Sequence, residues 1–317
     1  MIRSTVLFVL AFVIWLPAFA QGATFEVVEN DEGVTVKLDG ALLTRYLVDS
    51  GGKPILWPII GPTGKEMTRA YPMRKGNPDE KVDHQHHRSF WYTHGDVNGI
   101  DFWAESKNSG TIVHRRFDQV QGGDKALITT RNDWIGPDGK IQCEDERKLS
   151  FGASGEARWI DFDITIKATQ GKVTFGDTKE GTFGIRMPGT MRVEVKRGGK
   201  IINSEGDIDV DAWGNQAAWV DYHGPVDGAT LGIAILNHPS SFRFPTYWHV
   251  RVYGLFAANP FGLHNFKNSN DVDGSHTLES GESFSQHYRV LFHKGDEKTG
   301  KIAEAFSRYA KLKKGAR

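Results

Sequence analysis

Three histidines within four residues form the part of this sequence best equipped for chemistry. They lie in the stretch D-H-Q-H-H-R-S-F-W, residues 83–91, where His84 and His86 stand two positions apart. In an extended segment these two imidazoles point to one face and His87 points to the other. Two neutral imidazoles on one face can chelate a divalent ion, so we expect His84 and His86 to be metal ligands. A third ligand would have to come from elsewhere in the chain.

The same histidines could instead move protons, because an unperturbed imidazole titrates near neutral pH. His87 is then the candidate acid or base of this stretch. Arg88 beside it could hold a carboxylate or a developing oxyanion with two parallel hydrogen bonds. The remaining alternative is that the histidines bond to backbone carbonyls and pack within a loop.

A second concentration of polar and aromatic residues occupies three segments between residues 219 and 262. Prolines interrupt these segments, and since proline cannot donate to a strand ladder, the segments are expected to include loops at the rim of the fold. His238 and His249 are candidates for proton transfer, and Arg251 is a candidate for stabilising an enolate.

Aromatic rings next to Asp, Asn, Arg and His are suited to holding a sugar, because rings stack on its C–H faces while the polar groups bond its hydroxyls. Carboxylates for glycoside chemistry include Glu180, Asp221 and the cluster at 144–146. Aromatic residues that merely fill a wide core are the alternative for any single ring. The predicted substrate-binding residues are Trp91, His94, Asp101, Trp103, Glu180, Arg186, Tyr222, Trp248 and Asn259.

The whole chain limits the kind of protein this can be. Residues 1–20 have a basic start, a short apolar run and an A-F-A end, which predicts a secretory signal peptide and a periplasmic or extracellular protein. Residues 21–317 are then expected to form one domain without stable membrane insertion. Lys plus Arg and Asp plus Glu each number 39, so no nucleic-acid partner is indicated. A single cysteine, Cys143, leaves no intramolecular disulfide.

Short runs that alternate polar and apolar residues recur along the chain, with glycine-rich turns between them. Only residues 298–314 have the spacing of an amphipathic helix, with Ile302, Phe306, Tyr309 and Leu312 on one side. These features predict an all-β fold, a large antiparallel β-sandwich with a short C-terminal helix. The predicted strands lie at 24–28, 33–40, 115–120, 125–130, 157–166, 191–196, 231–237 and 285–293.

The stretch at 83–103, together with W-V-D-Y-H-G-P-V-D-G at 219–228 and W-H-V-R-V-Y-G-L-F-A-A-N-P-F-G at 248–262, resembles a family of secreted bacterial proteins. That family, of largely unknown function, is labelled "methane oxygenase PmoA". A membrane methane oxygenase needs several spanning helices, whereas this chain has no apolar run of about 18–20 residues after its signal peptide, which excludes that activity. The resemblance implies a component of a polysaccharide-degrading system.

A more remote resemblance links N-H-P at 237–239 and L-E-S-G-E-S-F at 278–284 to the supersandwich fold of aldose epimerases, the galactose mutarotase-like proteins. It implies that His86 or His87 acts together with His238 as acid and base. The glutamate motif of those enzymes has no clear counterpart here.

Together these features predict an exported carbohydrate-active enzyme that cleaves a glycosidic bond, as a lyase or a hydrolase, with a uronic or oxidised sugar as a candidate substrate. We expect a divalent metal and no nucleotide cofactor. A glycan-binding protein without catalysis and an aldose or uronate epimerase remain as alternatives. The sequence does not indicate an oligomeric state.

Overall fold

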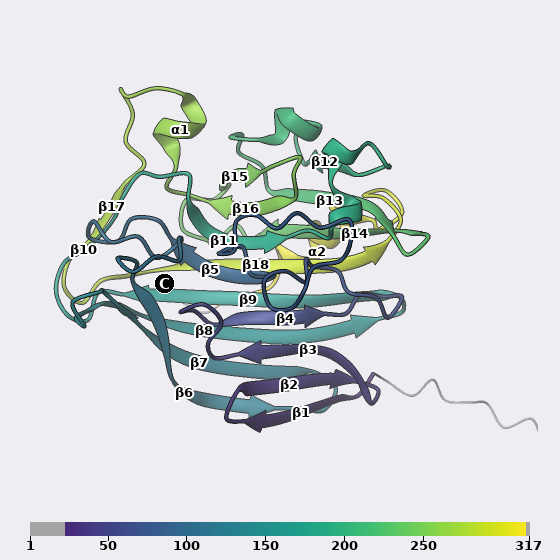
Figure 1. The fold of residues 1–317 in the computed structure, drawn as a ribbon, viewed down its shortest axis with the longest axis horizontal. Coiled ribbons are helices and arrows are strands. Elements are labelled where there is room, and N and C mark those ends of the chain that lie inside the picture. The colour runs from purple at the N-terminus through teal and green to yellow at the C-terminus, as the bar shows by residue number, and fades with distance from the viewer. Residues whose placement is uncertain (1–22, 315–317) are drawn as a thin grey trace, which may run out of the picture.

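A computed structural model describes residues 23–314, which form two eight-stranded sheets and one two-stranded sheet, all paired antiparallel (Figure 1). In spatial order the first sheet comprises β1 (Phe25–Asn30), β2 (Gly33–Leu38), β3 (Ala41–Leu47), β4 (Ile55–Ile59), β5 (Phe90–His94), β11 (Gly181–Arg186), β16 (Leu255–Asn259) and β15 (Tyr247–Val250). The second comprises β12 (Lys200–Asn203), β13 (Trp219–Val226), β14 (Ala229–Asn237), β18 (Ser283–Lys294), β9 (Ala157–Lys167), β8 (Ile141–Ser154), β7 (Ala126–Ile135) and β6 (Thr111–Gln121). The small sheet pairs β10 (Val173–Phe175) with β17 (His276–Leu278). The predicted all-β sandwich is confirmed.

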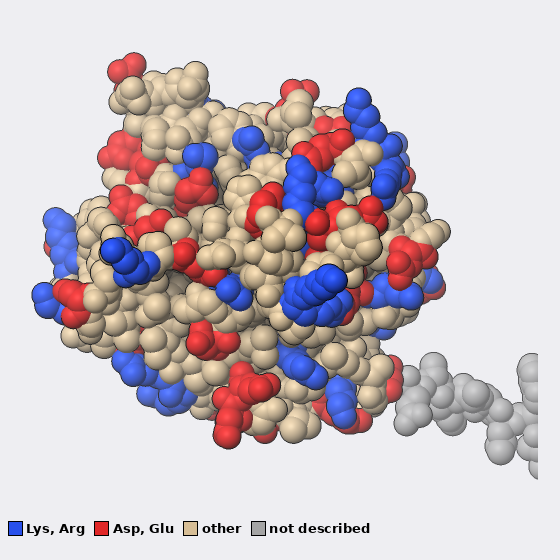
Figure 2. Space-filling model, viewed as in Figure 1, with Lys and Arg blue, Asp and Glu red and all other residues tan. Residues whose placement is uncertain are grey.

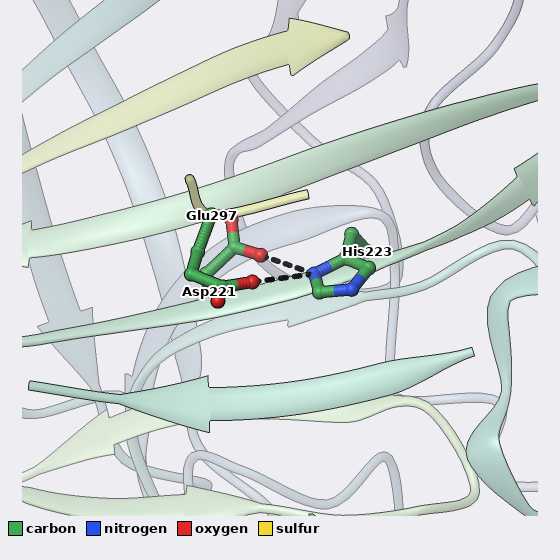
Figure 3. Close-up of side chains that lie close together, drawn as sticks. All are labelled: Asp221, His223 and Glu297. Atoms are coloured by element: carbon green, nitrogen blue, oxygen red, sulfur yellow. Dashed lines mark hydrogen bonds and ion pairs between the residues drawn. The ribbon is translucent and has the colours of Figure 1, made fainter. Parts of the chain in front are cut away.

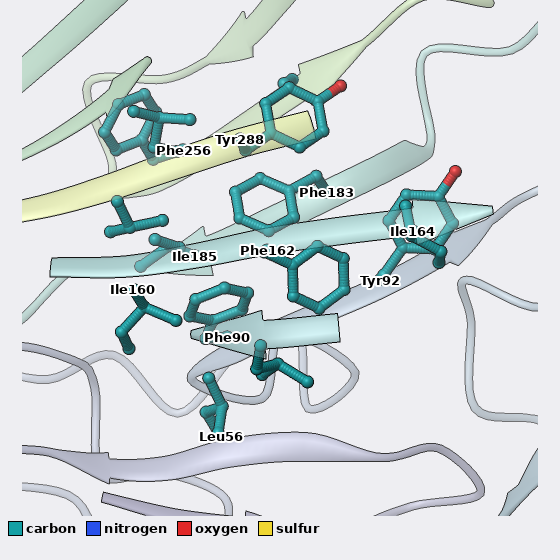
Figure 4. Close-up of a cluster of buried hydrophobic side chains, with 14 of the residues drawn as sticks. Leu56, Phe90, Tyr92, Ile160, Phe162, Ile164, Phe183, Ile185, Phe256 and Tyr288 are labelled. Carbon is teal, nitrogen blue, oxygen red and sulfur yellow. The ribbon is translucent and has the colours of Figure 1, made fainter. Parts of the chain in front are cut away.

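The main core lies between the two large sheets. Along β9, Ile160, Phe162, Ile164 and Ile166 are buried, whereas the residues between them face outward, as the period of two requires. Rings from the two sheets meet in this layer: Phe183 of β11 lies 5.1 Å from Phe162, between ring centroids (Figure 4). Burying each such side chain stabilises the fold by roughly 1.5–3 kcal/mol, and this layer fixes the spacing of the sheets.

A second, smaller apolar layer covers the outer face of the first sheet. Its buried members are Ile55, Trp91, Trp103, Leu255 and Ala257. Trp91 can lie flat there because Gly184 is its partner on the neighbouring strand, where a Cβ would stand 2.6 Å from the indole. This layer is the floor on which the polar residues of the next section lie.

Two predicted elements differ from the structure. Residues 191–196 were expected to form a strand, but that prediction is wrong, because short 3-10 turns and contacts with distant residues use their backbone donors. Met191, for example, donates to Pro188. The C-terminal helix is confirmed, although α2 spans only Ile302–Tyr309 and Leu312 beyond it is exposed.

The other helical elements are short: α1 (Leu263–Lys267) projects from one end of the sandwich beside β17, and 3-10 turns occupy Gly189–Met191, Val193–Val195 and Asp209–Ala212. None of the helices within 23–314 is long and apolar enough to cross a membrane. The signal peptide predicted for residues 1–20 lies outside the described residues.

Acidic and basic side chains are interspersed over the face of the molecule shown in Figure 2. No broad patch of Lys and Arg, the electrostatic mark of a nucleic-acid surface, appears on that face.

Candidate functional site

A pocket of about 450 Å³ opens on the outer face of the first sheet. It collects side chains from the β4–β5 connection, the loop after β5, the residues before β11, and the end of β15. We call it the histidine pocket. It is lined by His84, His86, His87, Asp101, Trp103, Ala104, Lys179, Glu180, His249, Arg251 and Tyr253.

Four rings stacked on one another build one side of the pocket. Tyr253 stacks on His84 with centroids 5.5 Å apart, His84 on His87 at 4.9 Å, and His87 on Trp91 at 5.3 Å. All three pairs are within 15° of parallel. The apolar outer layer therefore positions the imidazoles, and Trp91 lies beneath His87 without lining the pocket.

The histidine segment is a turn, so the condition of an extended segment, under which His84 and His86 would share one face, does not apply. The His87 amide donates to the His84 carbonyl at 2.9 Å, and His84 has a φ of 41°. The turn brings all three imidazoles together, with His86 at 4.5 Å from His87 and 5.8 Å from His84 between centroids.

One buried arginine holds this turn. The Arg69 guanidinium, 1 % exposed, donates to the carbonyls of Lys81, Asp83, His84 and His87 and to the Asp83 carboxylate at 2.8 Å. A turn has few backbone partners of its own, so a forked cation satisfies carbonyls that would otherwise be left without donors.

A second buried arginine determines which nitrogen of His87 carries the proton. Arg186 donates from Nη1 to His87 Nδ1 at 3.1 Å and from Nη2 to Asp83 at 2.9 Å. Because a guanidinium can only donate, Nδ1 is an acceptor, and neutral His87 carries its proton on Nε2. That Nε2–H has no hydrogen-bond partner within residues 23–314. Burial, and then the charges of His86 and Arg186, lower the pKa of His87 well below 6.5.

His249 has the same tautomer by a different contact. The Trp213 indole N–H donates to His249 Nδ1 at 3.0 Å, which leaves the proton on Nε2. Burial, followed by the charge of Arg251, lowers the pKa of His249 to about 3. Burial and Lys53 likewise lower the pKa of His86 to about 4. The pocket thus holds imidazoles that are neutral at pH 7.

His84 differs because a carboxylate stands next to it. Its Nδ1 lies 3.3 Å from Asp83 Oδ2, and the side chain is 44 % exposed. Burial acts against ionisation of Asp83, but Arg186, His84 and Arg69 outweigh it and lower the pKa of Asp83. An ionised Asp83 orients the His84 ring with Nδ1–H inward, leaving Nε2 as a lone pair for proton abstraction.

Some charged groups of the pocket have an ion partner among the described residues, and Arg251 has none. Arg251 lies over the rings of Trp213 at 5.4 Å and Tyr253 at 5.8 Å, and its guanidinium has no hydrogen bond or ion pair in the described part of the chain. Lys179 and Glu180, by contrast, form a 3.3 Å ion pair. Arg251 is therefore the cation available to an anionic ligand.

Two carboxylates also line the pocket. Asp101 Oδ1 accepts from the amides of Trp103 and Ala104, which shapes the loop after β5. Glu180, whose side chain is 37 % exposed, lines the pocket from the residue directly before β11. Eight predicted site residues thus meet in the pocket: His84, His86, His87, Asp101, Trp103, Glu180, His249 and Arg251.

Several predicted contact residues lie behind the pocket instead. Arg88, predicted to hold an oxyanion, is bound in two parallel hydrogen bonds to Glu105, at 2.7 and 2.8 Å. Tyr222 and Trp248 are fully buried, and their polar atoms bond backbone groups, so neither ring presents a face to a ligand. Arg186 does not line the pocket but supports it from behind, through His87, Asp83 and the ring of Tyr253, whose centroid lies 4.8 Å from its guanidinium.

Three further predicted site residues do not line the pocket. His94 is fully buried and contacts the Gly176 carbonyl at 2.9 Å, while Asn259 donates to the Thr178 carbonyl. His238 lies beside α2, where it contacts the Leu312 carbonyl at 3.0 Å. The acid–base pair implied for His86 or His87 with His238 therefore does not assemble in one site.

Lys179 and Tyr253 line the pocket but were not among the predicted site residues. Tyr253 follows Arg251 by two positions, within the aromatic segment already singled out, which is the only signal that could have selected it. Lys179 has no such signal, because only the fold brings it opposite the histidine turn.

The structure does not place a third ligand with His84 and His86 at metal-binding distance. Within residues 23–314, the only group of three whose ligand atoms all lie within 4.8 Å of one another is Asp221, His223 and Glu297, on the other sheet. The divalent ion at His84 and His86 stays a prediction.

Comparison with known proteins decides the family. The chain matches a family of unknown function over residues 33–307. It belongs to that family, DUF6807. The predicted membership in a family of unknown function is confirmed. No curated protein sequence matches the chain.

Similar solved structures share little sequence with it. A galactose mutarotase-like protein from Clostridium acetobutylicum has 12 % identity and a TM-score of 0.40, with 86 % of this chain and 99 % of that one covered. A similar protein from Lactobacillus casei has 10 % identity and a TM-score of 0.39, covering 85 % and 100 %. The galactosidase domain of an α-galactosidase-sucrose kinase has 11 % identity and a TM-score of 0.43. That match covers 86 % of this chain but only 42 % of the other chain.

Proposed function

We propose that this protein is an exported carbohydrate-active enzyme that cleaves a glycosidic bond beside a uronic acid by β-elimination, with the histidine pocket as its active site. One observation carries the proposal: Arg251, a cation without an ion pair among the described residues, lines the same pocket as two imidazole N–H donors, His87 and His249. Export rests on the signal peptide predicted at residues 1–20 and places the enzyme in the periplasm or outside the cell.

Arg251 would bind the substrate carboxylate. A guanidinium offers two parallel donors to a carboxylate, and partial neutralisation makes the neighbouring C–H more acidic. Tyr253, whose ring lies beside Arg251 and forms one end of the ring stack, offers an aromatic face for the sugar.

His84 would take the proton from the carbon next to the carboxylate. Its Nε2 lone pair is directed by the contact between Nδ1 and Asp83. As the C–H bond breaks, the electron pair forms a double bond to the adjacent carbon, and the bond from that carbon to the glycosidic oxygen breaks. The departing oxygen takes a proton from water, and His84 returns its proton to solvent.

His87 and His249 would stabilise the enolate-like charge that develops on the carboxylate. Both present Nε2–H, and both have lowered pKa values, so they donate hydrogen bonds as neutral groups without giving up a proton. Donors already oriented in a water-poor site stabilise developing charge at little reorganisation cost. Removing one such donor typically costs about 10²–10³ in kcat.

Hydrolysis is the second candidate, because Asp101 and Glu180 both line the pocket and two carboxylates are the usual equipment of a glycosidase. The two reactions give different products. Elimination leaves an unsaturated uronate that absorbs ultraviolet light, whereas hydrolysis leaves a new reducing end without that chromophore.

The test incubates the purified mature chain with uronate-containing polysaccharides and with the same polymers after carboxyl reduction. Unsaturated product from the uronate polymers alone, lost in Arg251→Gln but retained in Arg131→Gln, supports elimination. Reducing ends without absorbance, lost in Glu180→Gln, would show hydrolysis. Solvent deuterium entering the sugar without cleavage would show an epimerase, and binding without turnover a glycan-binding protein.

A further inference from the structure

A second histidine cluster lies on the outer face of the second sheet, away from the histidine pocket. His223 of β13, Gly232 of β14 and His293 of β18 stand side by side in the strand register. Asp221, two residues before His223, shares its face of β13. The cluster is completed by Glu297, from the segment that joins β18 to α2.

Asp221 is the centre of this cluster. It is fully buried and contacts His223 Nδ1 through one carboxylate oxygen at 2.6 Å and His293 Nε2 through the other at 2.6 Å. Two histidines on one buried carboxylate fix its orientation, so its oxygens cannot rotate toward other partners.

Two glycines make room for His293. A Cβ on Gly232 would stand 2.2 Å from the His293 ring, and a Cβ on Gly300 would stand 2.4 Å from its Nδ1. The imidazole therefore passes over β14, from β18 to Asp221 on β13, only because both neighbours lack a side chain.

Glu297 is a nearly buried carboxylate without a hydrogen bond. Its side chain is 10 % exposed, and its single recorded partner is His223 Nδ1, at 4.0 Å. Figure 3 shows Glu297 and Asp221 both facing this one nitrogen of His223. A carboxylate removed from water needs a cation or donors, and the residues described here supply neither at bonding distance.

The charges of the cluster do not balance. Both nitrogens of His293 face oxygen acceptors, Nε2 the Asp221 carboxylate at 2.6 Å and Nδ1 the Lys294 carbonyl at 3.2 Å, so His293 orients Asp221 rather than binding an ion itself. Two carboxylates, Asp221 and Glu297, face one nitrogen of His223, and a cation between them would offset their charge.

We propose that Asp221, His223 and Glu297 bind a divalent cation of the zinc class, with His293 holding the second oxygen of Asp221. One nitrogen and two oxygens suit such an ion and leave a fourth position for water. The 2.6 and 4.0 Å separations bracket the roughly 3.3 Å between ligands that tetrahedral bonds of about 2.0–2.1 Å require. To ligate through Nδ1, neutral His223 carries its proton on Nε2.

The bound ion joins the second sheet to the segment that leads into α2. Ile302, the first residue of α2, donates its amide to the Glu297 carbonyl at 3.0 Å, and its side chain is fully buried against the sheet. The bound ion would therefore tie the start of the C-terminal helix to the second sheet, and the site is independent of the function proposed for the histidine pocket.

The experiment adds Zn²⁺ alone to the full chain after chelator treatment, and measures bound metal per chain and the melting temperature. We expect about one ion per chain and a rise in melting temperature, as for any ligand that binds only the folded state. Glu297→Gln and His223→Gln should lose the ion and the rise, and His293→Gln should weaken binding by about 10–100-fold.

Two controls separate this site from others. Glu304→Gln changes an exposed carboxylate of the neighbouring helix, and a His84→Gln, His86→Gln double variant changes the pocket; both should keep the ion. Metal-free Glu297→Gln should melt no lower than the metal-free parent, which excludes misfolding as the cause of lost binding. An ion that survives Glu297→Gln and His223→Gln, or one lost only in the pocket variant, would overturn the proposal, as would no bound ion in the parent.

Discussion

The histidine pocket on the first sheet and the Asp221 cluster on the second sheet use the same side chain with opposite partners. In the pocket, His87 touches Arg186 and His249 lies near Arg251, and both pKa values fall. In the Asp221 cluster, His293 touches a carboxylate and its pKa rises. Burial is the largest cause in each case and penalises the charged imidazole. Cationic neighbours add to it at His87 and His249, whereas Asp221 outweighs it at His293.

The difference shows what each region is suited to do. Neutral imidazoles with a defined N–H can donate hydrogen bonds to developing negative charge. In the Asp221 cluster two imidazoles lie on one carboxylate and a second carboxylate stands nearby, which suits a cation whose ligand Asp221 is held by His293. The histidines of this sequence therefore do not share one common role.

The largest expected effect is on turnover. His84→Gln keeps the size of the side chain but removes the Nε2 base, and we expect kcat on a uronate polymer to fall by about 10²–10⁴. His276→Gln, outside the pocket, should leave kcat unchanged. Equal turnover in both variants would remove His84 from the reaction.

The next effect is on stability. Arg69→Met leaves several turn carbonyls without their donor and Asp83 with only Arg186, and we expect the free energy of unfolding to drop by at least about 1–3 kcal/mol. Arg74→Met breaks an exposed bidentate pair with Glu66 and should cost only about 0–1 kcal/mol. Denaturant titration measures both, and similar losses would contradict the role given to Arg69.

The pH dependence follows from the lowered pKa of His249. Its folded value is about 3 and its unfolded value near 6.5, so between these values the unfolded chain binds more protons. Stability contributed by neutral His249 is thus complete above about pH 6.5 and is lost as the pH falls toward 3, by up to about 1.4 kcal/mol per unit. His249→Gln should flatten the stability curve over this window, and an unchanged slope would refute the assignment.

His293 should give the opposite dependence of stability on pH. Its raised folded pKa means that the stability it contributes is complete below about pH 6.5 and is lost as the pH rises through the folded value. Gly232→Ala displaces its ring from Asp221, and we expect a loss of about 1–3 kcal/mol together with a lower His293 pKa measured by NMR titration. A stable variant with an unshifted His293 would contradict the packing argument.

The all-β fold follows from the sequence because alternation along segments such as 157–166 depends only on local periodicity. The run at 191–196 alternates equally well but forms 3-10 turns, with the Arg192 side chain reaching back to the carbonyls of Gly189 and Asp79. The alternation of polar and apolar residues within a segment does not predict such contacts with distant residues.

The candidate site was predictable in its residues and not in their roles. The concentration of histidines at 84–87 and the aromatic segment before 262 do meet in space, as residue types alone suggested. The tautomers of His87 and His249 depend on Arg186 and Trp213, which are distant in sequence, and no local pattern assigns them. Asp221 and His223 were visible in the sequence, but their partner Glu297 lies more than seventy residues downstream.

The most direct test of the contrast between the two histidine clusters is an imidazole ¹H–¹⁵N correlation spectrum at pH 7, assigned with His87→Gln, His249→Gln and His293→Gln. We predict neutral rings protonated on Nε2 for His87 and His249, and a doubly protonated ring for His293. An imidazolium at His87 or His249, or a neutral His293, would contradict the conclusion that neighbouring charge sets the role of each histidine.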